Sequence, residues 1–158
     1  MRQFTHILVI NRLMANTTVA LHEGIRLAKT FGADLSLLRI YSNPVAVDME
    51  AVNAPGLFIK GEEYKNYMSV REQYKEELEK AIQQVEKDGI RIKKHLTDKE
   101  PVAEILRLVA EEHIDLIVAL AHEEGGLEHL LFGGENDKII RKMPCSVLLV
   151  KHEPKPVL

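Results

Sequence analysis

The chain has 158 residues, and its 46% hydrophobic content is enough to build the core of one domain of ordinary size. Lys and Arg total 21 against 24 Asp and Glu, so no basic excess exists to neutralise a nucleic-acid backbone. No apolar run is long enough to span a bilayer, and the N-terminus lacks the apolar region and cleavage site of a signal peptide. The only cysteine, Cys145, fits a reducing compartment. We therefore expect a cytoplasmic protein that binds neither nucleic acid nor a membrane.

Short aliphatic runs alternate with stretches of helical periodicity along the chain. The first run, Ile7–Ile10, is continuously aliphatic, as in strands buried on both faces, and a loop at Asn11–Asn16 follows it. Thr17 or Thr18 can cap the first helix. The expected strands are 7–10, 35–41, 90–96, 115–120 and 145–151, and the expected helices lie within 17–32, 62–88, 101–113 and 133–142.

This alternation predicts an α/β fold, a doubly wound five-stranded parallel sheet with helices on both faces. Residues 1–152 form a single domain in this interpretation, and 153–158 are a C-terminal tail. The segment 43–61 has no clear period and is expected to be a long excursion. Ligands of such sheets lie beyond the carboxyl ends of the strands, where the strand order reverses. The loops at 11–16 and 121–132 are therefore the expected site.

Several segments together resemble the universal stress protein family. They are the opening "ILVI", then "LAKTFGADLSLLRI", "AEILRLVAEEHIDLIVAL" and "GLEHLLFGGENDKIIRKMPCSVLLVK". The resemblance covers nearly all of the chain apart from 43–61, and its most specific part is the last segment. It implies a Rossmann-like fold of the adenine nucleotide α-hydrolase type and, commonly, a homodimer made through the last strands.

Many members of that family bind ATP through a loop of the form G-x-x-G, nine residues, then G-[S/T]. Placed on this sequence, the pattern falls on Leu120, Glu123, Gly133 and Gly134, so only Gly133 is kept. An acidic residue often stands at the end of the first strand in the ATP binders. That position is Arg12 here, preceded by Asn11.

Each departure from the pattern works against a bound nucleotide. Leu120 brings a branched side chain where glycine allows close backbone approach. Glu123 puts a carboxylate near a phosphate oxygen, and two unit charges ~4 Å apart repel by ~4 kcal/mol at an effective dielectric of ~20. Gly134 lacks the hydroxyl donor, although amides at a helix N-terminus still attract anions. The resemblance therefore predicts a non-catalytic regulatory or stress-response module with a degenerate loop and no cofactor; the alternative is a member that binds ATP or AMP.

Two other candidate sites are weaker. His122, Glu123, Glu124 and His129 could bind a divalent metal, but their spacing is nonspecific and a solvated polar loop is the simpler interpretation. Cys145 could be a redox thiol, but a small apolar role fits its place at the entry of a strand better. The histidines at 6 and 95 are expected to be satisfied structural residues within strands.

The last strand bears on the oligomeric state. "SVLLV" is too apolar for an edge strand left open to solvent. We therefore expect a homodimer through this strand, while any other protein partner stays unknown. The charged helix at 62–88 has an apolar stripe but no sustained heptad, so it is expected to cover one sheet face and not to form a coiled coil.

Overall fold

The computed structural model describes residues 3–12, 18–40, 62–97, 100–121, 134–142 and 144–151, without the side chains of 62–68, 70–71 and 134–137. Strands and helices alternate along these residues, as the sequence predicts. The elements are β1 (His6–Arg12), α1 (Val19–Phe31), β2 (Asp34–Ile40), α3 (Glu62–Lys87), β3 (Ile92–Thr97), α4 (Pro101–Glu112), β4 (Leu116–Leu120), α6 (Gly134–Lys142) and β5 (Ser146–Val150).

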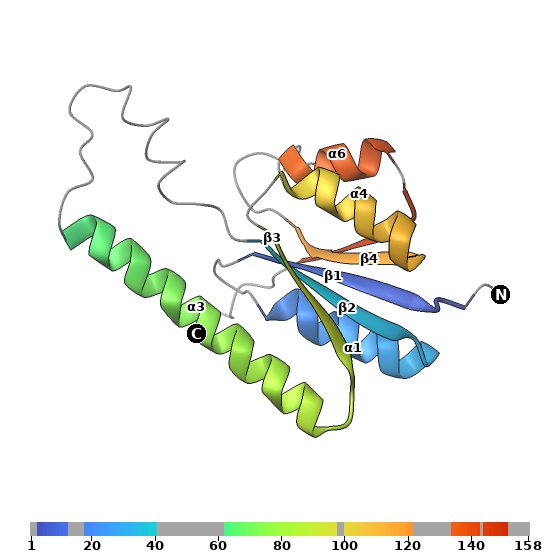
Figure 1. Ribbon diagram of the computed structural model, residues 1–158, viewed down its shortest axis with the longest axis horizontal. Coiled ribbons are helices and arrows are strands. Elements are labelled where there is room, and N and C mark those ends of the chain that lie inside the picture. The colour runs from blue at the N-terminus through green and yellow to red at the C-terminus, as the bar shows by residue number, and fades with distance from the viewer. Residues whose placement is uncertain are drawn as a thin grey trace, which may run out of the picture.

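The strands form one five-stranded sheet in the order β3-β2-β1-β4-β5, and every neighbouring pair is parallel. Figure 1 shows α1 and α3 on one face of the sheet and α4 and α6 on the other. The prediction of a doubly wound parallel sheet is therefore confirmed. The strand order reverses between β1 and β4, which places the switch point at the centre of the sheet.

Each face of the sheet has its own apolar core, because the central strands are buried on both sides. On one face, Leu21 of α1 and Leu78 and Ile82 of α3 pack over Ile7 and Val9 of β1. On the other face, α4 and α6 pack over alternate residues of the same strands; the buried members include Leu8, Leu38, Ile105, Leu108, Ile117 and Ile139. Continuous aliphatic runs such as "ILVI" supply both cores at once.

The helix ends follow local capping chemistry only in part. The Glu100 side chain accepts hydrogen bonds from the backbone N–H groups of Val102 and Ala103 and so caps α4, a role that the sequence interpretation missed. Gly32 ends α1 in the left-handed conformation, with φ of 64°. Thr18 stands at the N-cap of α1, but its side chain makes no capping hydrogen bond, so that expectation is wrong for Thr18.

The first strand is longer than predicted. Asn11 and Arg12 belong to β1 and not to the loop, because they pair with Arg39 and Ile40 of β2. A polar residue after "ILVI" suggested a loop, but the ladder with β2 extends the strand by two residues. Both polar residues are therefore held at the carboxyl end of the sheet.

The long helix α3 covers the sheet with only its C-terminal half (Figure 1). Leu78, Ile82 and Val85 are buried against the sheet, whereas Ser69 lies further toward the N-terminus and is exposed. The expectation that this helix covers one face is confirmed for that half. Among the helices that the structure describes, none is both long and apolar enough to cross a membrane.

Asp115 joins the start of β1 to the connection between α4 and β4. Its Oδ2 accepts hydrogen bonds from the Thr5 backbone N–H at 2.8 Å and the Thr5 hydroxyl at 2.9 Å, and its Oδ1 accepts from the His6 N–H at 3.0 Å. Burial alone would raise the pKa of Asp115, but these hydrogen bonds outweigh it and lower the pKa below the ordinary value of the group.

The lowered pKa of Asp115 gives a pH prediction. A depressed carboxyl pKa adds stability that is present above the unfolded-state pKa, about 4, and is lost as the pH falls through the folded-state value. We expect Asp115→Asn to lower the free energy of unfolding by about 1 kcal/mol near neutral pH, and by progressively less below about pH 4. Urea unfolding across this range measures it. A constant difference between the two proteins at every pH would contradict the assignment.

Candidate functional site

The two central strands separate at the switch point. The ladder between β1 and β4 ends at the pair Val9–Val118. Beyond it, each strand pairs only with its outer neighbour, β1 with β2 as far as Arg12–Ile40 and β4 with β5 as far as Leu120–Val150. Ligands of doubly wound sheets lie beyond the carboxyl ends of the strands at such a switch point.

Asn11 and Arg12 lie at the carboxyl end of β1, on one side of the switch point. Asn11 is buried, at 3% exposure, and lies two residues beyond the last pair that β1 shares with β4. Arg12 is half-buried at the end of the strand, and burial lowers the pKa of its guanidinium. The arginine nevertheless keeps its positive charge at neutral pH. A cation therefore stands where the family's ATP binders often have a carboxylate.

Leu120 lies on the other side of the switch point. It pairs with Val150 in the ladder between β4 and β5, and the next residue, Ala121, donates a backbone hydrogen bond to the Val150 carbonyl at 2.8 Å. The first glycine position of the family pattern is therefore held inside a strand. Leu120 lies two residues beyond the last shared pair, as Asn11 does, so the two residues are at the same level on either side of the switch point.

The remaining positions of the pattern are only partly described. Gly134 is the first residue of α6, as predicted, so a helix N-terminus is present after the loop. Glu123 and Gly133 lie outside the described residues. The structure thus places Asn11, Arg12 and Leu120 at the carboxyl ends of the two central strands, beside the switch point, and leaves the predicted repulsion by Glu123 as a prediction.

The two weaker candidates have different outcomes. His122, Glu123, Glu124 and His129 all lie outside the described residues. Within the residues that the structure does describe, no group of three or more His, Cys, Asp or Glu is placed to hold a metal ion.

Cys145 is half-buried, and its burial raises the pKa of the thiol to about 11. A thiol with so high a pKa is protonated at neutral pH and reacts slowly, which agrees with the structural role predicted for it.

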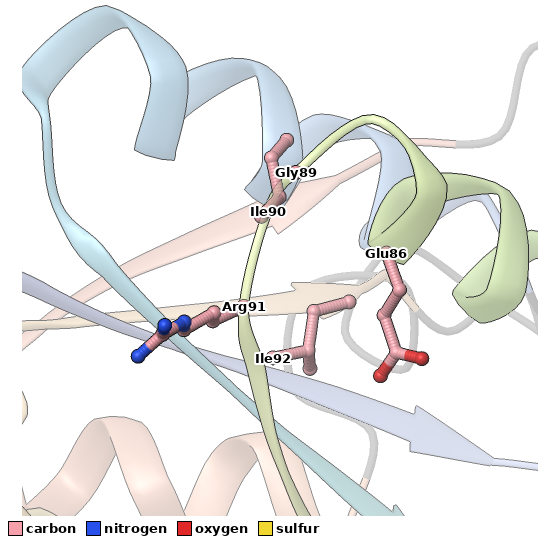
Figure 2. A pocket seen from close by; sticks show the side chains of 5 residues that line it. All are labelled: Glu86, Gly89, Ile90, Arg91 and Ile92. Atoms are coloured by element: carbon pink, nitrogen blue, oxygen red, sulfur yellow. The ribbon is translucent and has the colours of Figure 1, made fainter.

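A separate pocket of about 500 Å³ lies at the turn from α3 into β3. It is lined by Glu86, Gly89, Ile90, Arg91 and Ile92. Figure 2 shows the Glu86 and Ile92 side chains next to each other and Arg91 on the other side of the strand. The Glu86 carboxylate is already paired with Lys94 Nζ at 2.6 Å. Because the pocket lies at the start of β3, it is at the opposite end of the strands from the switch-point residues Arg12 and Leu120.

One polar cluster was not predicted. The strand histidines both have polar partners, as expected: His6 through hydrogen bonds, and His95 through Nε2, which lies against Glu112 Oε1. Both rings face Glu112, the last residue of α4. The signal available in the sequence was a polar residue, Ser36, inside a buried apolar strand.

Comparisons with known proteins agree with this geometry. The model of the universal stress protein family matches residues 3–151. Universal stress protein MJ0531 of Methanocaldococcus jannaschii is 26% identical over 136 residues, which cover 86% of this chain and 75% of that protein. The solved structure of protein MJ0577 of the same organism is similar with a TM-score of 0.66 and 19% identity, over 98% of this chain and 100% of that one.

A further solved structure carries a ligand. The universal stress protein from Archaeoglobus fulgidus, in complex with dAMP, is similar with a TM-score of 0.52 and 18% identity, over 96% of this chain and 100% of that one. At these identities the solved structures show the fold alone. The family model spans nearly the whole chain, and the chain therefore belongs to the universal stress protein family.

Proposed function

We propose that this chain acts as a dimeric, non-catalytic regulatory or stress-response module of the cytoplasm, with a nucleotide-binding loop that has lost its function. One observation carries the proposal. The switch point is flanked by Arg12 on β1 and Leu120 on β4, where the family's ATP pattern has an acidic residue and a glycine. Arg12 does not supply the carboxylate of the ATP pattern, and Leu120 does not supply the flexible backbone of its glycine.

Leu120 opposes nucleotide binding through both its backbone and its side chain. Its pairing with Val150 keeps the chain extended, whereas a phosphate loop needs a backbone that turns and presents its N–H groups. The next position of the pattern, Glu123, adds a negative charge. At ~4 Å from a phosphate oxygen this charge costs ~4 kcal/mol at an effective dielectric of ~20, or roughly three decades of affinity.

The two edges of the sheet support the dimer. Residues Val147–Val150 of the edge strand β5 are all half-buried and apolar. The opposite edge strand, β3, exposes Lys93 and Lys94, which protect it against pairing with another chain. An apolar edge without such charges is the one that a second copy covers, so we assign the dimer interface to β5.

A second candidate function is an ATP- or AMP-binding module with an altered loop. The observation that favours it is the start of α6 at Gly134, because free amides at a helix N-terminus attract phosphate groups. The dAMP complex of the Archaeoglobus fulgidus relative shows that this fold can hold an adenine nucleotide. In this alternative the amides around α6 compensate for Leu120 and Glu123.

Restoring the family pattern separates the two functions. We expect the triple variant Leu120→Gly, Glu123→Gly, Gly134→Ser to bind ATP at least weakly, while the wild type shows no measurable binding at micromolar protein. Among the single variants, Glu123→Gly should raise affinity more than Gly134→Ser, because a repelling charge costs more than a missing neutral hydrogen bond. Isothermal titration calorimetry with ATP and Mg²⁺ measures both. Triple-variant affinity no better than that of the wild type would show that the loop is not the obstacle.

A further inference from the structure

The strand β3 forms the edge of the sheet opposite β5. It pairs with β2 along its whole length, from Ile92 beside Leu35 to Thr97 beside Ile40, and among the described residues no strand pairs with its outer side. An edge strand presents a row of backbone N–H and C=O groups with which an extended segment can pair. Peptides bind many proteins by adding a strand to such an edge, where backbone hydrogen bonds supply affinity and side-chain pockets supply specificity.

A pocket adjoins the start of this edge. It is the one of about 500 Å³ at the turn from α3 into β3, and Arg91 and Ile92 are among the residues that line it. Gly89 in this turn has a left-handed backbone, with φ of 86°, and a Cβ atom there would meet no atom within 4 Å. The start of the edge is therefore open to a side chain of a bound segment.

The side of β3 that faces α3 is apolar at both ends. Ile92 belongs to the core beneath α3, and Leu96, two alternate positions further on, lies on the same face of the strand. Leu96 is 58% exposed and is the one large hydrophobic side chain that is exposed among the described residues. Lys94 lies between them, and its charge is balanced by Glu86 of α3.

The opposite side of β3 is basic. Arg91, Lys93 and His95 alternate with the apolar set, and Figure 2 shows Arg91 on the other side of the strand from Glu86 and Ile92. Arg91 is exposed and forms no ion pair with a described residue. Lys93 Nζ lies 3.6 Å from Glu112 Oε2, but this lysine side chain is 64% exposed, so solvent screens the pair and the ammonium group stays accessible.

These charges determine which partner fits the edge. A second copy of this chain pairing edge to edge would bring Lys93 and Lys94 close to their own counterparts, and like charges oppose such pairing. An acidic segment meets opposite charges instead. Side chains of an extended segment alternate between the two faces of the sheet. A segment with acidic residues at every second position and apolar residues between them therefore complements both sides of β3.

We propose that the outer edge of β3 is a docking site for a protein partner, which adds an extended segment of alternating acidic and apolar residues to the sheet. The acidic side chains lie along Arg91 and Lys93, while the apolar side chains cover Leu96 and enter the pocket beside Ile92. The inference depends neither on the nucleotide-binding loop nor on a dimer through β5, because both lie elsewhere on the sheet.

The test titrates the full-length protein with a short blocked peptide of alternating Glu and Val residues. A second peptide with Lys in place of every Glu has the same shape and the opposite charge. We expect the acidic peptide to shift the NMR amide signals of β3 and not those of β5. We also expect it to bind about tenfold more tightly than the basic peptide, because each close charge pair at the surface changes from repulsion to attraction.

Two charge reversals show whether the basic side of β3 takes part. Arg91→Glu should weaken binding of the acidic peptide about tenfold, whereas Lys29→Glu, the same change at an exposed position of α1, should weaken it less than about twofold. Neither side chain forms an ion pair with a described residue, so both variants should keep the circular dichroism spectrum of the wild type.

Four results would each overturn the proposal. They are equal affinity for the acidic and basic peptides, equal effects of Arg91→Glu and Lys29→Glu, amide shifts in β5 in place of β3, and no amide shifts with the acidic peptide at millimolar concentration.

Discussion

Gly24→Ala is expected to lower the free energy of unfolding by about 2 kcal/mol. A Cβ atom at Gly24 of α1 would lie 2.3 Å from Val9 Cγ2 of β1, much closer than carbon atoms approach. Val9 is fully buried and branched at Cβ, so it cannot turn away without entering the surrounding core. Overpacking typically costs about 1–3 kcal/mol, and so close a contact should cost about 3 kcal/mol or more. Ala has a better helix propensity than Gly by about 1 kcal/mol, which offsets part of this cost. Urea unfolding measures the difference.

A double-mutant cycle isolates the contact between α1 and β1. Val9→Ala removes the methyl group that the new Cβ would meet, so Val9→Ala with Gly24→Ala should be less destabilised than the sum of the two single variants by about 1 kcal/mol or more. Effects that add within about 0.5 kcal/mol would mean that Gly24 is not required for the close packing of the helix on the central strand.

Val147→Lys is expected to dissociate the proposed dimer. Val147 is in the edge strand β5, and a two-fold interface would bring the two new ammonium groups near each other across the symmetry axis. Like charges in an interface cost several kcal/mol, so we expect the dissociation constant to rise by about a hundredfold or more. Light scattering at micromolar concentration should then give the monomer mass for this variant and the dimer mass for the wild type.

The opposite edge of the sheet provides a matched control. Leu96, on β3, is 58% exposed, and Leu96→Lys should leave the dimer mass unchanged. Circular dichroism must show that both variants keep the helical content of the wild type, because Val147 also packs against the core beneath α4. A monomeric wild type, or loss of the dimer in Leu96→Lys and not in Val147→Lys, would place the interface elsewhere or exclude it.

The sequence was most informative where a single local pattern, such as an aliphatic run or one Pro or Gly residue, determines the structure. The run "ILVI" is buried on both faces, and its strand, β1, is the central strand of the doubly wound sheet. Pro101 begins α4 and Gly32 ends α1, as their backbone preferences require. The end of β1 was less predictable, because Asn11 and Arg12 are held in the strand by the ladder with β2, a contact between distant segments.

The sequence predicted where in the fold the candidate site lies, but not how buried its residues are or which residues surround them. Alternation and family resemblance locate Arg12 and Leu120 at the switch point, and the structure places both there. The burial of Asn11 depends on tertiary packing that no local pattern encodes. The cluster of His6, Ser36 and Glu112 was missed for the same reason, since 76 residues separate Ser36 from Glu112.

The claim that the nucleotide site is lost is tested most directly by titrating the wild-type protein with ATP and Mg²⁺, and separately with AMP, in a calorimeter. The account predicts no binding heat at micromolar protein, and no thermal stabilisation by a large excess of nucleotide. A ligand at ~100 times its dissociation constant would add ~2.7 kcal/mol to the free energy of unfolding. Micromolar binding of either nucleotide would contradict the account, and would mean that the amides at the start of α6 suffice despite Arg12 and Leu120.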